Sequence, residues 1–165
     1  MISLANEYYP SRNIRETVLA RRREPVVWSN KAPPSSISKD AVNHYQENGF
    51  VVLPNLISGK LLRILQQEMH DLREQYKGSR DETVISEPDS NTVRTLFNLP
   101  SISQVFDELS RHPALLSFAR HVLDSEVYLH QTRLNYKSGF DGKEFYWHSD
   151  FETWHVEDGM PAMRA

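Results

Sequence analysis

Apolar side chains recur at helical spacing in two segments of the chain, residues 38–49 and 58–78. In the first segment Ser38 is a preferred capping residue and Gly49 a natural end. The second segment follows the same scheme, with Ser58 as its cap and Gly78 as its end. Its apolar positions are Leu61, Leu62, Leu65, Met69, Leu72 and Tyr76. We therefore predict two helices, the second with an apolar stripe that faces the core.

The chain before these helices is interrupted by prolines, so residues 1–36 are predicted to form an irregular arm. Within it, Val26–Trp28 is either a short strand or an anchor that packs the arm onto the domain. Residues 37–165 are predicted to form the domain itself. Inside that domain, Phe50–Pro54 follows the first helix as a short apolar run closed by proline, which predicts a buried strand.

The middle of the chain changes from polar to helical. Residues 79–91 are polar and predicted to be a loop. After Pro100, two more helical stretches are expected around residues 105–109 and 113–123, with Pro113 at a first helical position. Up to this point the pattern predicts only a mixed α and β domain typical of enzymes.

From residue 127 to residue 137 the chain is rich in β-forming residues, which predicts a strand. Side chains of a strand alternate between its two faces. One face then carries Val127, Leu129, Gln131, Arg133, Asn135 and Lys137. The other carries Tyr128, His130, Thr132, Leu134 and Tyr136. The first face becomes more polar along the strand. A strand at the protein surface would show the same pattern, so the polarity alone does not identify a site. A turn at residues 138–142 leads to a second strand that begins near Glu144.

Composition narrows the chemistry. The chain has no cysteine, which excludes disulfides and thiolate chemistry, so any metal must be held by His, Asp, Glu or carbonyl oxygens. A net charge of -3 offers no general attraction to nucleic acid or to an anionic membrane. Neither a signal peptide nor a membrane-spanning apolar run is visible, so we expect a cytoplasmic protein.

The most informative run is FYWHSDFETWH, residues 145–155. His148 and Asp150 are one residue apart, so in a strand they point to the same face with Cα atoms about 7 Å apart. A histidine and a carboxylate placed in this way form two thirds of the facial triad of non-haem Fe(II) oxygenases. A bare His-x-Asp is common, but aromatic neighbours favour a closed site here. His155 does not suit the same strand face, and we interpret it either as structural or as a residue that supports the metal ligands without binding the metal.

The run FYWHSDFETWHVEDGMP, with YLHQTRLNYKSGFDGKEF upstream, resembles the signature region of ectoine hydroxylases. These belong to the phytanoyl-CoA-hydroxylase-like branch of the Fe(II)- and 2-oxoglutarate-dependent dioxygenases. The resemblance implies an α+β fold: the N-terminal part of a cupin-like double-stranded β-helix, or jelly roll, with flanking helices. It also implies conversion of ectoine to 5-hydroxyectoine, with 2-oxoglutarate and O2 consumed and succinate and CO2 formed. Family members often form homodimers, which is the only ground for expecting one here.

By motif position, the resemblance assigns a role to each of several residues. His148 and Asp150 match the first two iron ligands. Gln131 and Trp154 match residues that contact ectoine. Lys137 matches a residue that contacts 2-oxoglutarate, and Arg133, Asn135 and Phe145 resemble further residues that line this pocket.

The family's second histidine ligand and the arginine that anchors 2-oxoglutarate have no counterpart before Ala165. We therefore expect a fragment or a truncated gene product that on its own binds iron weakly and does not hydroxylate. Two alternatives to an ectoine hydroxylase are a related oxygenase acting on another small polar substrate and a non-catalytic remnant. Reading the nucleotide sequence past the codon for Ala165 would separate the remnant from the enzyme.

Overall fold

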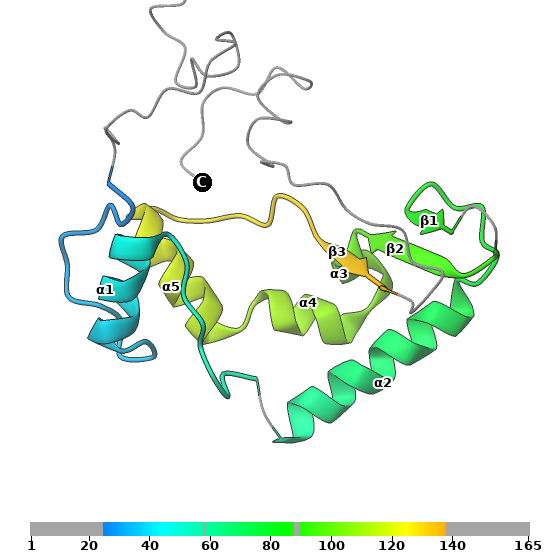
Figure 1. Cartoon of the computed structure of the whole chain (residues 1–165), viewed down its shortest axis with the longest axis horizontal. Coiled ribbons are helices and arrows are strands. Elements are labelled where there is room, and N and C mark those ends of the chain that lie inside the picture. Colours follow the sequence, from blue (N-terminus) through cyan, green and yellow to red (C-terminus); the bar gives the residue numbers. More distant parts are fainter. Residues whose placement is uncertain (1–24, 58, 88–89, 138–165) are drawn as a thin grey trace, which may run out of the picture. The chain divides into compact units, whose positions relative to one another are not determined.

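The computed structural model of the chain describes residues 25–57, 59–87 and 90–137. All of these except Pro25 belong to one unit of the fold, Val26–Tyr146. Along the chain, two helices are followed by two strands, three helices and one strand (Figure 1). The helices are α1 (Lys39–Asn48), α2 (Gly59–Gln75), α3 (Leu99–Ile102), α4 (Gln104–Ser110) and α5 (Pro113–Leu123), and the strands are β1 (Val84–Ser86), β2 (Val93–Phe97) and β3 (Arg133–Asn135).

Helix α1 has both of the ends that the sequence predicts. The Ser38 hydroxyl oxygen accepts a hydrogen bond from the backbone N–H of Ala41 at 3.1 Å, and this caps the N-terminus. At the other end Gly49 adopts φ 77° and donates its N–H to the carbonyl oxygen of Tyr45. Glycine takes this left-handed conformation without steric cost, so the helix ends here.

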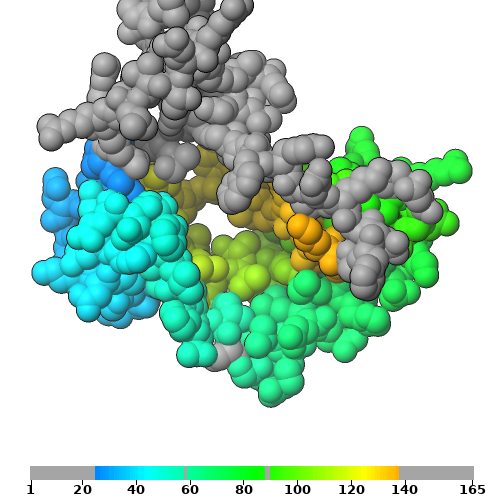
Figure 2. Space-filling view, viewed as in Figure 1, coloured from blue at the N-terminus to red at the C-terminus, as the bar shows by residue number. Residues whose placement is uncertain are grey.

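The segment before α1 is anchored to the unit rather than paired as a strand. Val27 packs against a core cluster formed by Ile37, Val42 and Ala114. The backbone N–H of Trp28 donates to the carbonyl oxygen of Val122 at 2.8 Å. Of the two predictions for Val26–Trp28, the anchor is therefore confirmed. Residues 25–57, blue to cyan in Figure 2, form a continuous surface around α1.

A second core cluster joins α2 to the sheet. Its buried members are Leu72, Val93, Leu96, Leu99 and Tyr136, with Met69 and Tyr76 packed against them. The predicted apolar stripe of α2 is confirmed at Leu65 and Leu72, which are buried. It is wrong at Leu62, which stays exposed because the stripe is wider than the surface that covers it. Ser58, the predicted cap, lies outside the described residues.

The three strands form an antiparallel sheet in the order β1-β2-β3. The prediction of a loop over residues 79–91 is wrong at β1, where Val84 pairs with Leu96 and Ile85 with Thr95. Three residues are too few to show the alternation that identifies a strand, and polar neighbours hide it further. Strand β2 was not predicted at all. It is largely buried, and it pairs with β1, which closely precedes it in the chain, and with β3, which lies about forty residues later.

The prediction of a buried strand at Phe50–Pro54 is wrong. No helix or strand of the described residues includes this segment, and Phe50 and Val52 are 58% and 73% exposed. Val51 and Leu53 are half-buried, and Leu53 packs against the cluster of Ile37, Val42 and Ala114. The alternation expected of a strand is present, but a strand also needs a hydrogen-bonded neighbour, and none lies beside it in the described part of the chain.

The long strand predicted over residues 127–137 is reduced to β3. Its pairing with β2 ends at Phe97 and Arg133, because β2 itself ends there. The N–H of Asn98 still donates to the carbonyl oxygen of Thr132, but Tyr128 and Leu129 lie beyond the sheet and are exposed.

Among the described residues, none of the helices combines the length and the apolar character that crossing a membrane requires.

Candidate functional site

The predicted alternation of side chains is confirmed at β3 and its flanks. Gln131, Arg133, Asn135 and Lys137 are all exposed. The residues between them, Thr132, Leu134 and Tyr136, are half-buried or buried. We call the first four residues the polar face of β3. These four are the predicted site residues that the structure describes, and it brings them together on one side of the sheet.

Asn135 on the polar face is tied to the neighbouring strand. It pairs with Thr95 in the register of β2 and β3. The Thr95 hydroxyl donates a hydrogen bond to the side-chain carbonyl oxygen, Oδ1, of Asn135 at 2.9 Å. Thr95 is buried whereas Asn135 is exposed, so the bond joins a buried hydroxyl to a side chain at the surface. The amide nitrogen of Asn135 is left as a donor for other groups.

Arg133 and Gln131 form a second connected pair on the same face. The Arg133 guanidinium donates from Nη2 to Oε1 of Gln131 at 2.6 Å. Its Cζ also lies 5.8 Å from the centre of the Phe97 ring, which is within the range of a cation–π contact. As at Asn135, the amide oxygen of Gln131 accepts from a protein donor, so its amide nitrogen is left as a donor.

The opposite side of β3 fixes the strand to α2. The hydroxyl of Tyr136 donates to the backbone carbonyl oxygen of Met69 in α2. Burial raises the pKa of Tyr136 to about 12, and the nearby Glu68 carboxylate adds to the effect while the Arg73 cation opposes it. Tyr136 therefore stays protonated and keeps this hydrogen bond at any pH near neutrality. This contact holds the strand whose other face carries the candidate site.

The polar face presents hydrogen-bond donors rather than acceptors. Two amide nitrogens, the Arg133 guanidinium and the Lys137 ammonium group are all donors, whereas the two amide oxygens are already engaged. A surface of this kind suits a carboxylate ligand. No group of three or more potential metal-ligating side chains occurs among the described residues.

The remaining predicted site residues lie outside the described residues. They are Phe145, His148, Asp150 and Trp154. The predicted turn at residues 138–142 and the strand near Glu144 also lie outside them. The donor chemistry of His148 and Asp150, one imidazole nitrogen and one carboxylate, is that of a non-haem Fe(II) site, and a chain without cysteine offers no competing thiolate.

Two residues that touch the polar face were missed in the sequence. Thr95 and Phe97 both lie on β2 and contact Asn135 and Arg133. The alternation of Val93, Thr95 and Phe97 is the signal that could have identified them. The run is only five residues long, however, and lies between a polar segment and a proline, so it did not predict a strand.

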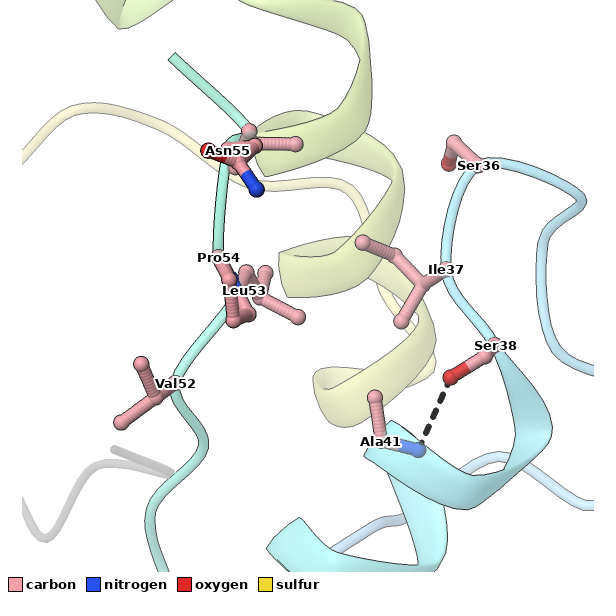
Figure 3. Close-up of a pocket in the computed structure, with 9 residues that line it drawn as sticks. Ser36, Ile37, Ser38, Ala41, Val52, Leu53, Pro54 and Asn55 are labelled. Carbon is pink, nitrogen blue, oxygen red and sulfur yellow. Dashed lines mark hydrogen bonds between the residues drawn. The ribbon is translucent and has the colours of Figure 1, made fainter. Parts of the chain in front are cut away.

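A hollow of about 300 Å³ lies elsewhere, between the start of α1 and residues 52–56 (Figure 3). Ile37, Leu53 and Pro54 line it, and it holds no predicted site residue.

Comparison with known proteins identifies the family. The family model for phytanoyl-CoA dioxygenase (PhyH) matches residues 45–164. The ectoine dioxygenase of Bordetella bronchiseptica is 46% identical over 165 residues, which are 100% of this chain and 54% of that protein. The ectoine dioxygenase of Sphingopyxis alaskensis is 43% identical over 162 residues, which are 96% of this chain and 52% of that protein.

Solved structures agree with these relatives. The crystal structure of EctD from S. alaskensis with 2-oxoglutarate and 5-hydroxyectoine matches with a TM-score of 0.84 and 41% identity, over 96% of this chain and 56% of that one. The structure of the same protein with bound Fe matches with a TM-score of 0.79 and 43% identity, over 87% and 51%. The chain therefore spans about half the length of the relatives it matches. The resemblance to ectoine hydroxylases seen in the sequence is confirmed, and because the family model covers most of the chain, the chain belongs to the phytanoyl-CoA dioxygenase family.

Proposed function

We propose that the protein to which residues 1–165 belong is an ectoine hydroxylase. It would convert ectoine to 5-hydroxyectoine while 2-oxoglutarate and O2 become succinate and CO2. The observation that carries the proposal is the 46% identity to an ectoine dioxygenase over all 165 residues. The similarity to a structure that contains both 2-oxoglutarate and 5-hydroxyectoine supports it.

His148 and Asp150 would supply two ligands to Fe(II), which when bound provides the activation of dioxygen that this reaction class requires. Neither residue needs a proton-transfer role. The polar face of β3 and the aromatic residues near His148 would bind and orient the two organic substrates. Such positioning is a large part of what a protein contributes to a reaction that its cofactor performs.

Lys137, Asn135, Arg133 and Phe145 would bind 2-oxoglutarate. The ammonium group of Lys137 and the outward amide nitrogen of Asn135 are donors that match a dicarboxylate. Arg133 would act through its charge and by holding its neighbour Gln131 at 2.6 Å. Phe145 would close the pocket against water.

Gln131 and Trp154 would bind ectoine. The amide nitrogen of Gln131, left over by the bond to Arg133, can donate to the ectoine carboxylate. The indole of Trp154 can place its π face against the delocalised cation of the ectoine ring. A zwitterion would in this way be recognised at both of its charges.

The proposal extends to the whole fold. Residues 37–165 would form the N-terminal part of a cupin-like jelly roll with helices packed outside it, and residues 1–36 an arm. The exposed Phe50 and Val52 fit this view, because an extended segment with alternating burial is suited to pair with another strand. The homodimer and a cytoplasmic location also belong to the proposal.

The substrate is tested by giving the complete gene product Fe(II), 2-oxoglutarate and either ectoine or proline, and measuring the succinate formed. Ectoine should stimulate succinate formation and proline should not. Stimulation by proline alone would point to a related oxygenase with another small polar substrate.

The ligand assignment is tested separately by the iron content of the purified protein. His148→Ala and Asp150→Ala should each abolish iron retention, because a facial triad that lacks one ligand binds the metal weakly. His155→Ala is the matched control and should keep its iron. Stoichiometric iron in either of the first two variants would show that the assignment is wrong.

A further inference from the structure

Thr95 lies beside the polar face of β3, on the neighbouring strand β2, and forms a hydrogen bond with one of its members. It lies in β2 directly opposite Asn135, and its Oγ1 donates to Oδ1 of Asn135 at 2.9 Å. Thr95 is 4% exposed, whereas Asn135 is exposed. The bond therefore runs from a buried, rigid strand to a side chain at the surface of the site.

This bond decides which way the amide of Asn135 points. An asparagine amide can turn over and exchange its oxygen for its nitrogen, and an exposed one does so readily in water. A hydroxyl donor held beside the amide on β2 favours the orientation with the oxygen toward β2. The nitrogen then points toward the open side of the sheet and presents donors only.

The orientation matters because of the neighbouring charges. Arg133 and Lys137 lie on the same face of β3, one position on either side of Asn135 along that face. An amide oxygen turned toward this face would add an acceptor where a carboxylate has to bind. An amide nitrogen turned toward it completes a row of donors.

We propose that Thr95 is a positioning residue for 2-oxoglutarate: it holds the Asn135 amide with its nitrogen toward a carboxylate of the co-substrate. The inference rests on the proposed function, since it takes 2-oxoglutarate as the ligand of this face. Thr95 itself does not touch the ligand. Its effect passes through Asn135 alone.

The variant Thr95→Val tests the inference without disturbing the fold. Valine has nearly the same shape as threonine and at least an equal preference for strands. Removal of the hydroxyl leaves no buried polar group unpaired, because the freed oxygen of Asn135 is exposed and can bond to water. Thr95→Ser keeps the hydroxyl and is the conservative control. Thr92→Val, at a half-buried threonine that precedes β2, controls for the chemistry of the substitution.

The affinity for 2-oxoglutarate is measured by calorimetry on the complete gene product loaded with Fe(II) under argon. Thr95→Val should raise the dissociation constant about fivefold, the factor that one net hydrogen bond is worth. Thr95→Ser and Thr92→Val should stay within about twofold of the wild type. In the Asn135→Ala background, Thr95→Val should have no further effect, since its only route to the ligand is gone.

A second measurement does not depend on the ligand. The side-chain amide signals of Asn135, observed by NMR, should show a rigid group in the wild type and a mobile one in Thr95→Val. Rigid signals in both proteins would overturn the inference, and so would an effect of Thr95→Val on affinity that persists in the Asn135→Ala background. If the wild type binds no 2-oxoglutarate although its Asn135 amide is rigid, the proposed function fails and the inference about the ligand falls with it, whereas the bond itself stands.

Discussion

Replacement of Tyr136 by phenylalanine tests how the candidate strand is held in place. The substitution removes only the hydroxyl that donates to the carbonyl oxygen of Met69. The ring stays in the core cluster with Leu72 and Leu96. Met69 lies within α2, so its carbonyl oxygen keeps the ordinary helical hydrogen bond and is not left unpaired. The cost should therefore be that of one neutral hydrogen bond, about 1 kcal/mol.

The same residue predicts a dependence on pH. Burial raises the pKa of Tyr136 from 10.0 to about 12, so ionisation is less favourable in the folded protein than in the unfolded chain. The stability that Tyr136 contributes is complete below pH 10 and is lost as the pH rises toward 12. Tyr136→Phe cannot ionise at this position. The difference in the free energy of unfolding between wild type and Tyr136→Phe should therefore become smaller as the pH rises from 10 toward 12.

The measurement is urea denaturation of both proteins at pH 8 and at several values between pH 10 and 12. Tyr128→Phe is the matched control, because the Tyr128 side chain lies beyond the sheet and is 75% exposed. Its cost should stay within about 0.5 kcal/mol. The reasoning is refuted if Tyr136→Phe costs no more than Tyr128→Phe at pH 8, or if wild type and Tyr136→Phe lose stability equally above pH 10.

Two further substitutions test the parts of the fold that support the site. Ser38→Ala removes the cap of α1 and should lower the free energy of unfolding by about 1 kcal/mol in urea denaturation, whereas Ser38→Asp should restore it. Equal stability of wild type and Ser38→Ala would contradict the role of the cap. Leu96→Ala empties a fully buried position beside Thr95 and should cost about 2–5 kcal/mol in the same assay. Leu129→Ala, at an exposed position, should cost about 0.5 kcal/mol or less, and similar losses for both leucines would show that the core is misassigned.

The parts of the fold that were predicted correctly depend on local signals. Helix α1 was found with both ends because Ser38 and Gly49 act on their immediate neighbours, through one capping bond and one backbone conformation. The alternation along residues 131–137 was found because it depends only on the geometry of an extended chain. In neither case does a distant partner decide the outcome.

The parts that were missed depend on partners outside their own segment. Phe50–Leu53 has the pattern of a strand, yet the described chain places no strand beside it. Strand β1 has no pattern of its own and exists because β2 lies next to it. Thr95 is next to the candidate site because β3, about forty positions later in the chain, places Asn135 opposite it. Pairing of this kind cannot be read from one segment at a time.

The candidate site, too, was predicted from the sequence only in part. The spacing of His148 and Asp150 and the long signature around them indicated the iron site from the sequence, and both residues lie outside the described part of the chain. The structure adds the contacts that support the polar face: Thr95 and Phe97 beside it on β2, and the Tyr136 anchor on the opposite side of β3. None of these three contacts follows from residue type or spacing.

The central claim is the reaction itself, and the most direct measurement is the ratio of its products. The complete gene product is given ectoine, 2-oxoglutarate, Fe(II) and air, and both 5-hydroxyectoine and succinate are quantified by mass spectrometry. An ectoine hydroxylase should form the two in equal amounts, with neither formed when 2-oxoglutarate is left out. Succinate without 5-hydroxyectoine, or no consumption of ectoine at all, would contradict the claim.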